Sequence, residues 1–173
     1  MKCTASGRTF RRQKIHEYGM KEASRKLSFI LDYVLSDKNR YKNSYINRIH
    51  SSIDRIIDRV EKGETTVAEL QMFLKEKYDA EIDLADSHSN RPQGYRSDYV
   101  NGVFEAQDKL NIILCYVFIH MYRMGQEKVN KLMLNINKAL TLYNQGYVTE
   151  SDIRRALWQE EGFKVRNIKE FKK

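Results

Sequence analysis

The feature that most constrains this chain is an apolar run from Leu110 to Ile119, which only Asn111 interrupts. The run is shorter than the about 20 residues that a membrane span needs, so it predicts a buried helix. Met124-Gly125 ends the pattern, and a second run follows at helical spacings of three and four. Its members are Val129, Leu132, Met133, Ile136, Leu140 and Tyr143. Two helices joined at a glycine form a helical hairpin, so residues 101–145 are expected to form the buried centre of an all-α protein.

The composition agrees with a helical protein because residues that break helices are scarce. The 173-residue chain has one proline and eight glycines, and a chain of this length buries a core without cross-links. Cys3 and Cys115 lie far apart, and Cys115 falls inside the apolar run, which favours a reduced compartment over a disulfide framework. No apolar segment follows Met1-Lys2, so we expect no signal peptide and a cytoplasmic location.

Apolar periodicity and end signals predict a compact bundle of about six helices. Thr66 with Glu69, and Thr149 with Asp152, are spaced as capping boxes at two of the helix starts. The expected helices cover roughly residues 20–35, 44–62, 67–77, 98–123, 126–145 and 150–161. A single helical domain over residues 19–163 is predicted, with N-terminal helices over 19–87, a loop over 88–97 that holds the only proline, and C-terminal helices over 98–163.

The net charge of +8 is concentrated at the two ends of the chain. Residues 1–16 hold five basic side chains and no acid, and residues 164–173 hold five basic side chains and one acid. These ends together exceed the total by one charge, so residues 17–163 carry −1. We predict a basic N-terminal arm over residues 1–18 and a basic tail over 164–173. Such ends often lie on phosphate backbones, although solvated termini have the same composition.

Basic and aromatic residues alternate just before the helix over residues 44–62, and its arginines share one face. Arginine and lysine supply charge for phosphates, and tyrosine rings stack on bases. The alternative is an ordinary charged surface, because Asp58 can pair with Lys62 on the same helix. The loop over 88–97 adds further candidates. The residues predicted to contact nucleic acid or a partner are Arg8, Arg11, Arg12, Lys14, Arg40, Tyr41, Lys42, Tyr45, Arg48, Arg55, Arg59, Arg91, Tyr95 and Arg96.

Sequence patterns of common catalytic and metal sites are absent. The chain contains no glycine-rich phosphate loop, no nucleophile elbow and no Cys or His pair at zinc-finger spacing. Asp79, Glu81 and Asp83 alternate within an acidic segment over residues 76–86. This alternation suits either a short edge strand or a divalent cation, but the spacing of an EF-hand loop is not present. We expect no catalytic residues, no metal and no cofactor.

One enzymatic pattern remains, because Arg11 and His16 are separated by four residues. The spacing resembles the Arg-x4-His motif of HEPN-type ribonucleases, which are also helical. In that family the motif lies on a core helix, and a polar residue often follows the arginine. Here Arg12 follows, and the motif falls in the basic N-terminal segment. The resemblance implies RNA cleavage as a third functional hypothesis.

Residues 118–163 carry a second resemblance. They combine a helix that ends near Gly125, a lysine-bearing helix, the turn Gly146-Tyr-Val-Thr149 and a closing helix that ends in Glu161-Gly162. This order resembles a segment that recurs in short, uncharacterised phage proteins of Gram-positive hosts. The resemblance implies a phage protein that acts in the cytoplasm of a bacterial host, in replication, transcription control or countering host defences. It implies no active site.

Two main functional hypotheses follow. The first is a phage-type, non-enzymatic accessory or regulatory protein that binds DNA or RNA through its basic helix face and basic termini. The second is an anti-defence, anti-CRISPR-like inhibitor that binds a host nuclease or its nucleic-acid complex. The acidic segment favours the inhibitor, because it suits a basic nucleic-acid channel, and tyrosines and arginines are typical interface anchors. The expected partner is therefore nucleic acid or a nucleic-acid-binding protein, and not a membrane.

Overall fold

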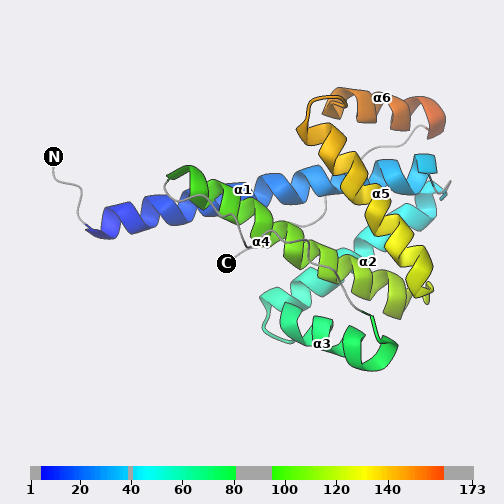
Figure 1. The fold of residues 1–173 in the computed structure, drawn as a ribbon, viewed down its shortest axis with the longest axis horizontal. Coiled ribbons are helices and arrows are strands. Elements are labelled where there is room, and N and C mark those ends of the chain that lie inside the picture. The colour runs from blue at the N-terminus through cyan, green and yellow to red at the C-terminus, as the bar shows by residue number, and fades with distance from the viewer. Residues whose placement is uncertain (1–4, 39–40, 81–94, 162–173) are drawn as a thin grey trace.

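The computed structural model describes residues 5–38, 41–80 and 95–161, with side chains at 9–36, 41–80 and 97–157. Every regular element in these ranges is helical, which confirms the predicted all-α bundle of about six helices (Figure 1). The elements are α1 (Ala5–Tyr33), the π-helical turn η1 (Val34–Lys38), α2 (Asn43–Glu61), α3 (Val67–Tyr78), α4 (Tyr95–Tyr116), the π-helical turn η2 (Val117–Met121), α5 (Gln126–Asn144) and α6 (Glu150–Glu161). None of the described helices is long and apolar enough to cross a membrane.

Helices α1 and α4 form the most extensive helix–helix contact among the described residues. Two glycines allow this contact, because Gly19 of α1 faces the carbonyl oxygen of Tyr99, and Gly102 of α4 faces that of His16. A Cβ at either position would lie under 3.0 Å from the facing oxygen, closer than real Cβ atoms come. Glycine permits this approach of one backbone to another. The two positions therefore fix how the helices cross.

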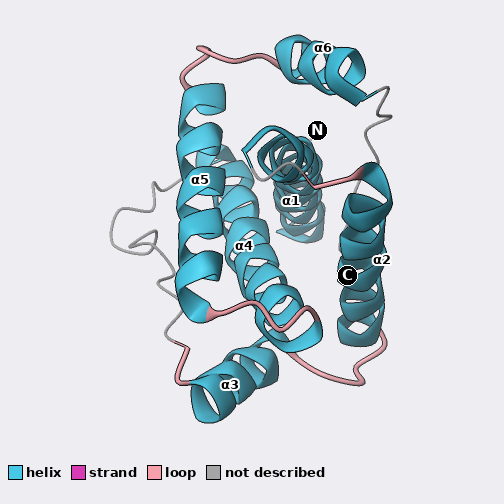
Figure 2. Cartoon of the chain, turned by 90° about the vertical axis from the view of Figure 1, so that its right-hand side faces the viewer, coloured by secondary structure: helices cyan, strands magenta, loops and turns pink. Residues whose placement is uncertain are grey.

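The predicted hairpin is present, but it shares the centre of the bundle with α1. The apolar run on α4 and η2 is buried, and α5 returns after Gly125 with Val129, Leu132, Ile136 and Leu140 buried. Helix α5 contacts α1, η1 and η2 rather than running along α4. Figure 2 shows α1 end-on between α2, α4, α5 and α6. A run that is apolar on all sides needs several neighbours, and α1 is the main one.

The predicted start of the first helix near residue 20 is wrong, because α1 runs unbroken from Ala5 through Gly19. Arg12 donates two hydrogen bonds to the carboxylate of Asp98, at 2.8 and 3.1 Å. His16 pairs with Glu105 at 3.0 Å. These contacts with α4 stabilise helix in a segment whose own periodicity is weak, which is how most protein helices are stabilised.

The ends of α3 and the start of α4 bear on several smaller predictions. Thr66 and Glu69 exchange hydrogen bonds at 2.7 and 3.1 Å, which confirms the capping box. Asp79 ends α3 with φ 49° instead of starting a strand. Glu81, Asp83, most of the 88–97 loop and the tail over 164–173 lie outside the described residues. The end of that loop is helical, since α4 begins at Tyr95.

Two ionisable side chains lie in the core between α1 and α2. Asp32 and His50 are fully buried, and His50 Nε2 hydrogen-bonds to an oxygen of Asp32. Removing one partner of such a pair leaves a buried polar group without its hydrogen-bond partner, which lowers the free energy of unfolding. The pair therefore holds α2 in one register against α1.

We expect Gly102→Ala to lower the free energy of unfolding by about 1–3 kcal/mol, because the added methyl group forces the α1 and α4 backbones apart. The higher helix propensity of alanine offsets part of this loss, by about 1 kcal/mol. Urea unfolding followed by circular dichroism measures the difference. Gly125→Ala is the control, since nothing lies within 4 Å of the Cβ it would add. A Gly102→Ala protein as stable as the wild type would contradict the close crossing.

Candidate nucleic-acid interface

Tyrosines and cations gather where the start of α2, the end of η2 and the first turn of α5 meet. The rings of Tyr41 and Tyr45 lie 4.8 Å apart between centroids, and Tyr122 meets Tyr45 edge-on at 5.3 Å. Arg48 lies 5.5 Å from the ring centre of Tyr45, and Lys128 lies 5.6 Å from that of Tyr41. These distances are within the range of cation–π attraction. We call these five residues the tyrosine–cation cluster.

Local structure explains why the rings meet. The backbone N–H of Tyr41 donates to the carbonyl of Leu35 at 3.0 Å, which ties the segment before α2 to η1. Tyr41 precedes the extended N-cap residue Lys42, so its ring meets that of Tyr45 across the start of α2. The hydroxyls of Tyr122 and Ser52 lie 3.3 Å apart and join the end of η2 to α2. The cluster is therefore anchored to three elements.

The environment favours the neutral form of Tyr45 and the charged form of Lys128. Burial raises the pKa of Tyr45, and the neighbouring tyrosines raise it further. A hydrogen bond with Tyr41 raises the pKa of Lys128. Arg48 and Lys128 are exposed, whereas the three rings are half-buried against the core. The cluster therefore places two exposed cationic side chains beside three half-buried rings.

The other predicted residues near α2 have different surroundings. Arg55 is exposed further along the helix, and Lys42 is exposed beside Tyr41. Arg59 pairs with Glu64 at 3.6 Å, which neutralises part of its charge. Of the predicted arginine face, only Arg48 contacts a tyrosine ring of the cluster.

Sequence reasoning did not single out Tyr122 and Lys128. They flank the turn at Gly125, and only the folded chain brings them to Tyr41 and Tyr45. The sequence of that turn could have indicated them, because Tyr122 and Lys128 lie on either side of Gly125 between two apolar helices.

The predicted residues on α1 lie at the opposite end of the molecule from the cluster (Figure 1). Arg11 is exposed, Arg12 pairs with Asp98, and Lys14 lies 4.5 Å from the ring centre of Phe10. The Arg12 guanidinium holds the pKa of Asp98 below its usual value. The structure therefore does not bring these basic side chains to the tyrosine–cation cluster. The side chains of Arg8, Arg40, Arg91, Tyr95 and Arg96 lie outside the described residues.

The two residues of the ribonuclease-like pattern point in different directions. Five residues along a helix correspond to a rotation of about 140°. Arg11 is exposed, while His16 pairs with Glu105 on α4. The two side chains therefore do not meet in one pocket.

A second polar group lies near the cluster, where α3 meets the turn between η2 and α5. Arg123 donates to the hydroxyl of Tyr78 at 2.7 Å, and this hydroxyl lies 2.9 Å from Nδ1 of His120. A guanidinium only donates, so Tyr78 accepts from Arg123, and the same hydroxyl also hydrogen-bonds with Nδ1 of His120. We call these three residues the Tyr78–His120–Arg123 triad.

The surroundings of His120 disfavour its protonated form. Burial lowers the pKa of His120, and the charges of Lys77 and Arg123 lower it further. A histidine with a depressed pKa resists protonation in the folded state. Its contribution to stability is therefore complete above the unfolded pKa of about 6.5 and is lost as the pH falls through the folded pKa.

We expect Arg123→Gly to raise the pKa of His120 towards its ordinary value, because one of the nearby positive charges is removed. Glycine also suits the left-handed backbone of this position, with φ 53°. An NMR titration of the imidazole protons measures the pKa. Lys138→Ala removes an exposed charge at a distance of about 18 Å along α5 from Gln126, and it should leave the pKa unchanged. An equal pKa in wild type and Arg123→Gly would contradict the geometry of the triad.

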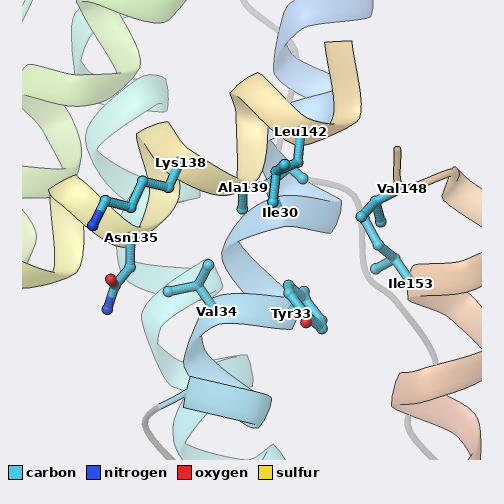
Figure 3. Close-up of a pocket in the computed structure, with 9 residues that line it drawn as sticks. All are labelled: Ile30, Tyr33, Val34, Asn135, Lys138, Ala139, Leu142, Val148 and Ile153. Carbon is cyan, nitrogen blue, oxygen red and sulfur yellow. The ribbon is translucent and has the colours of Figure 1, made fainter. Parts of the chain in front are cut away.

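Among the described residues, no group of three His, Cys, Asp or Glu side chains is placed to hold a metal ion. A cavity of about 260 Å³ lies between α1, α5 and α6. Figure 3 shows its mostly apolar lining, which is formed by Ile30, Tyr33, Val34, Asn135, Lys138, Ala139, Leu142, Val148 and Ile153.

The chain was compared with protein-family models, with curated proteins and with solved structures, and no match was found. The phage relationship predicted from residues 118–163 stays a prediction. What the structure defines is an all-α bundle that presents aromatic rings and cations at one end. Its function is argued from these side chains.

Proposed function

We propose that this is a phage-type accessory or regulatory protein, without enzymatic activity, that binds single-stranded nucleic acid on the tyrosine–cation cluster. The observation that carries the proposal is the convergence of three tyrosine rings and two exposed cations from elements far apart in the sequence. A single strand presents flat bases and charged phosphates side by side, and rings and cations are the groups that match them.

The expected energetics combine stacking with charge neutralisation. A base stacked on an aromatic side chain contributes about 1–3 kcal/mol. Each phosphate contact releases counterions, so log K falls with log salt with a slope of about −0.7 per contact for a single strand. Lys42 and Arg55, both exposed, extend the charged surface on either side of Arg48. Four such contacts give a slope of about −3.

The start of α5 supports a phosphate contact at the same place. Gly125 is the N-cap of the helix and makes no side-chain cap hydrogen bond, and Glu127 is the acidic residue of the first turn. The N–H groups of a first helical turn bind anions readily when no side chain occupies them. Lys128 belongs to this turn, so the backbone donors and its ammonium group lie together.

Binding of labelled single-stranded DNA, single-stranded RNA and duplex across a salt series tests the proposal. Single strands should bind more tightly than the duplex, and affinity should fall steeply with salt. The double variant Arg48→Ala/Lys128→Ala should bind more weakly, with a salt slope shallower by about 1.4 because two phosphate contacts are lost.

The control for this experiment is Lys131→Ala/Lys138→Ala, which removes the same charge from the exposed face of α5. It should keep the slope of the wild type apart from a small general effect of net charge. Equal losses in the two double variants would show that charge alone governs binding. Full affinity in a folded Arg48→Ala/Lys128→Ala protein would contradict the proposed interface.

A second candidate function is anti-defence binding to a host protein. Leu134, Leu142 and Tyr147 are 53%, 45% and 77% exposed on α5 and the turn that follows it. Exposed apolar side chains beside a cavity are typical of protein-binding surfaces. The test applies if no nucleic acid binds at low salt. This function would then be favoured if the wild type captured a host nuclease and the Leu134→Asp protein did not.

A further inference from the structure

A pocket of about 230 Å³ adjoins the Tyr78–His120–Arg123 triad. Ile119 and Met124 form an apolar wall, and Tyr78 and Arg123 supply polar groups; Gly125 and Gln126 complete the lining. A small ligand site typically combines a mainly apolar surface with a few fixed polar groups, in a volume of about 300–1,000 Å³. At about 230 Å³ this pocket is smaller than that range, so it suits only a small ligand or one unit of a polymer.

The polar side of the pocket is held in place before any ligand arrives. Arg123 has a left-handed backbone, with φ 53°, which is uncommon for a residue other than glycine. Such conformations persist where the surrounding structure holds them, often at ligand sites. Here the hydrogen bond to Tyr78 holds the guanidinium, and His120 in turn orients the Tyr78 hydroxyl.

The charge at this pocket favours an anion. Arg123 uses one of its five N–H donors on Tyr78, and a guanidinium binds phosphate strongly. Lys77 lies 5.7 Å from the ring centre of Tyr78 and adds a second positive charge. Both cations act on His120, whose pKa they lower. An anion bound beside Arg123 would neutralise this local positive field.

The pocket lies next to the tyrosine–cation cluster. Tyr122 belongs to the cluster and Arg123 to the triad, and the two are consecutive. Lys128 and Gln126 are two residues apart on α5, which places them on opposite sides of its first turn. A strand that lies on the cluster therefore reaches the pocket by passing over the start of α5.

We propose that this pocket binds one nucleotide with its phosphate on Arg123 and its base against Ile119 and Met124. The inference rests on the proposed function, because the nucleotide is most simply the phosphorylated end of the bound strand. A terminal phosphate carries more charge than an internal phosphodiester, and it suits Arg123 in the pocket lining with Lys77 nearby, beside the ring of Tyr78. A free nucleotide has the same chemistry and is the other source.

The test compares one oligonucleotide sequence with a 5′-phosphate, with a 3′-phosphate and with hydroxyl groups at both ends, by fluorescence anisotropy. One phosphorylated form should bind the wild type about tenfold more tightly than the hydroxyl form, a difference of about 1.4 kcal/mol. Arg123→Gly should abolish this preference and still bind the hydroxyl form. Tyr78→Phe keeps the ring and should weaken the preference, and Lys138→Ala should retain it.

The outcomes separate this inference from the proposed function. The inference would be overturned if the wild type bound all three oligonucleotides equally and adenosine monophosphate did not compete with them. The proposed function would remain intact in that case. If no oligonucleotide binds, the proposed function fails. In that case the wild type could still bind adenosine monophosphate and the Arg123→Gly protein fail to bind it. This result would support the pocket as a site for a free nucleotide. If the wild type did not bind adenosine monophosphate either, the inference would be overturned.

Discussion

The contact between the backbones of α1 and α4 is the constraint on which the rest of the structure depends. Gly19 and Gly102 let the two helices touch without intervening side chains. Both helices then run towards the same end of the molecule (Figure 1). Helix α1 continues into η1, to which Tyr41 is hydrogen-bonded, and α4 continues into η2 and Tyr122. The crossing therefore sets the distance between the two halves of the tyrosine–cation cluster.

Buried polar contacts complete the placement of the interface. The Asp32–His50 pair ties α2 to α1 in the core, and a pair of this kind is satisfied in only one register. Tyr45 and Arg48 on α2 are thereby fixed relative to α1. The Tyr78–His120–Arg123 triad lies on the other side of the first turn of α5. The hydrogen bond from Arg123 to the hydroxyl of Tyr78 fixes Arg123 against α3. A rigid frame of this kind lowers the entropy that the protein itself would lose on binding the proposed strand.

Sequence periodicity was enough for the fold class but not for the site. The apolar run from Leu110 to Ile119 predicted a buried helix, and Thr66 with Glu69 marked a helix start. The first half of α1 was missed because contacts with α4, not its own pattern, stabilise it. Tyr41, Tyr45 and Arg48 were found from local composition. Tyr122, Lys128 and the triad depend on contacts between distant segments, which spacing along one helix does not show.

The central claim is that a single nucleic-acid strand binds where α2, η2 and α5 meet. The most direct test is an NMR titration of the isotope-labelled protein with a short single-stranded oligonucleotide, with amide signals assigned. The account predicts the largest shifts at Tyr41, Tyr45, Arg48, Tyr122 and Lys128, with α1 near Arg11 unaffected. Shifts confined to Leu134, Leu142 and Tyr147, or no shifts at low salt, would contradict it.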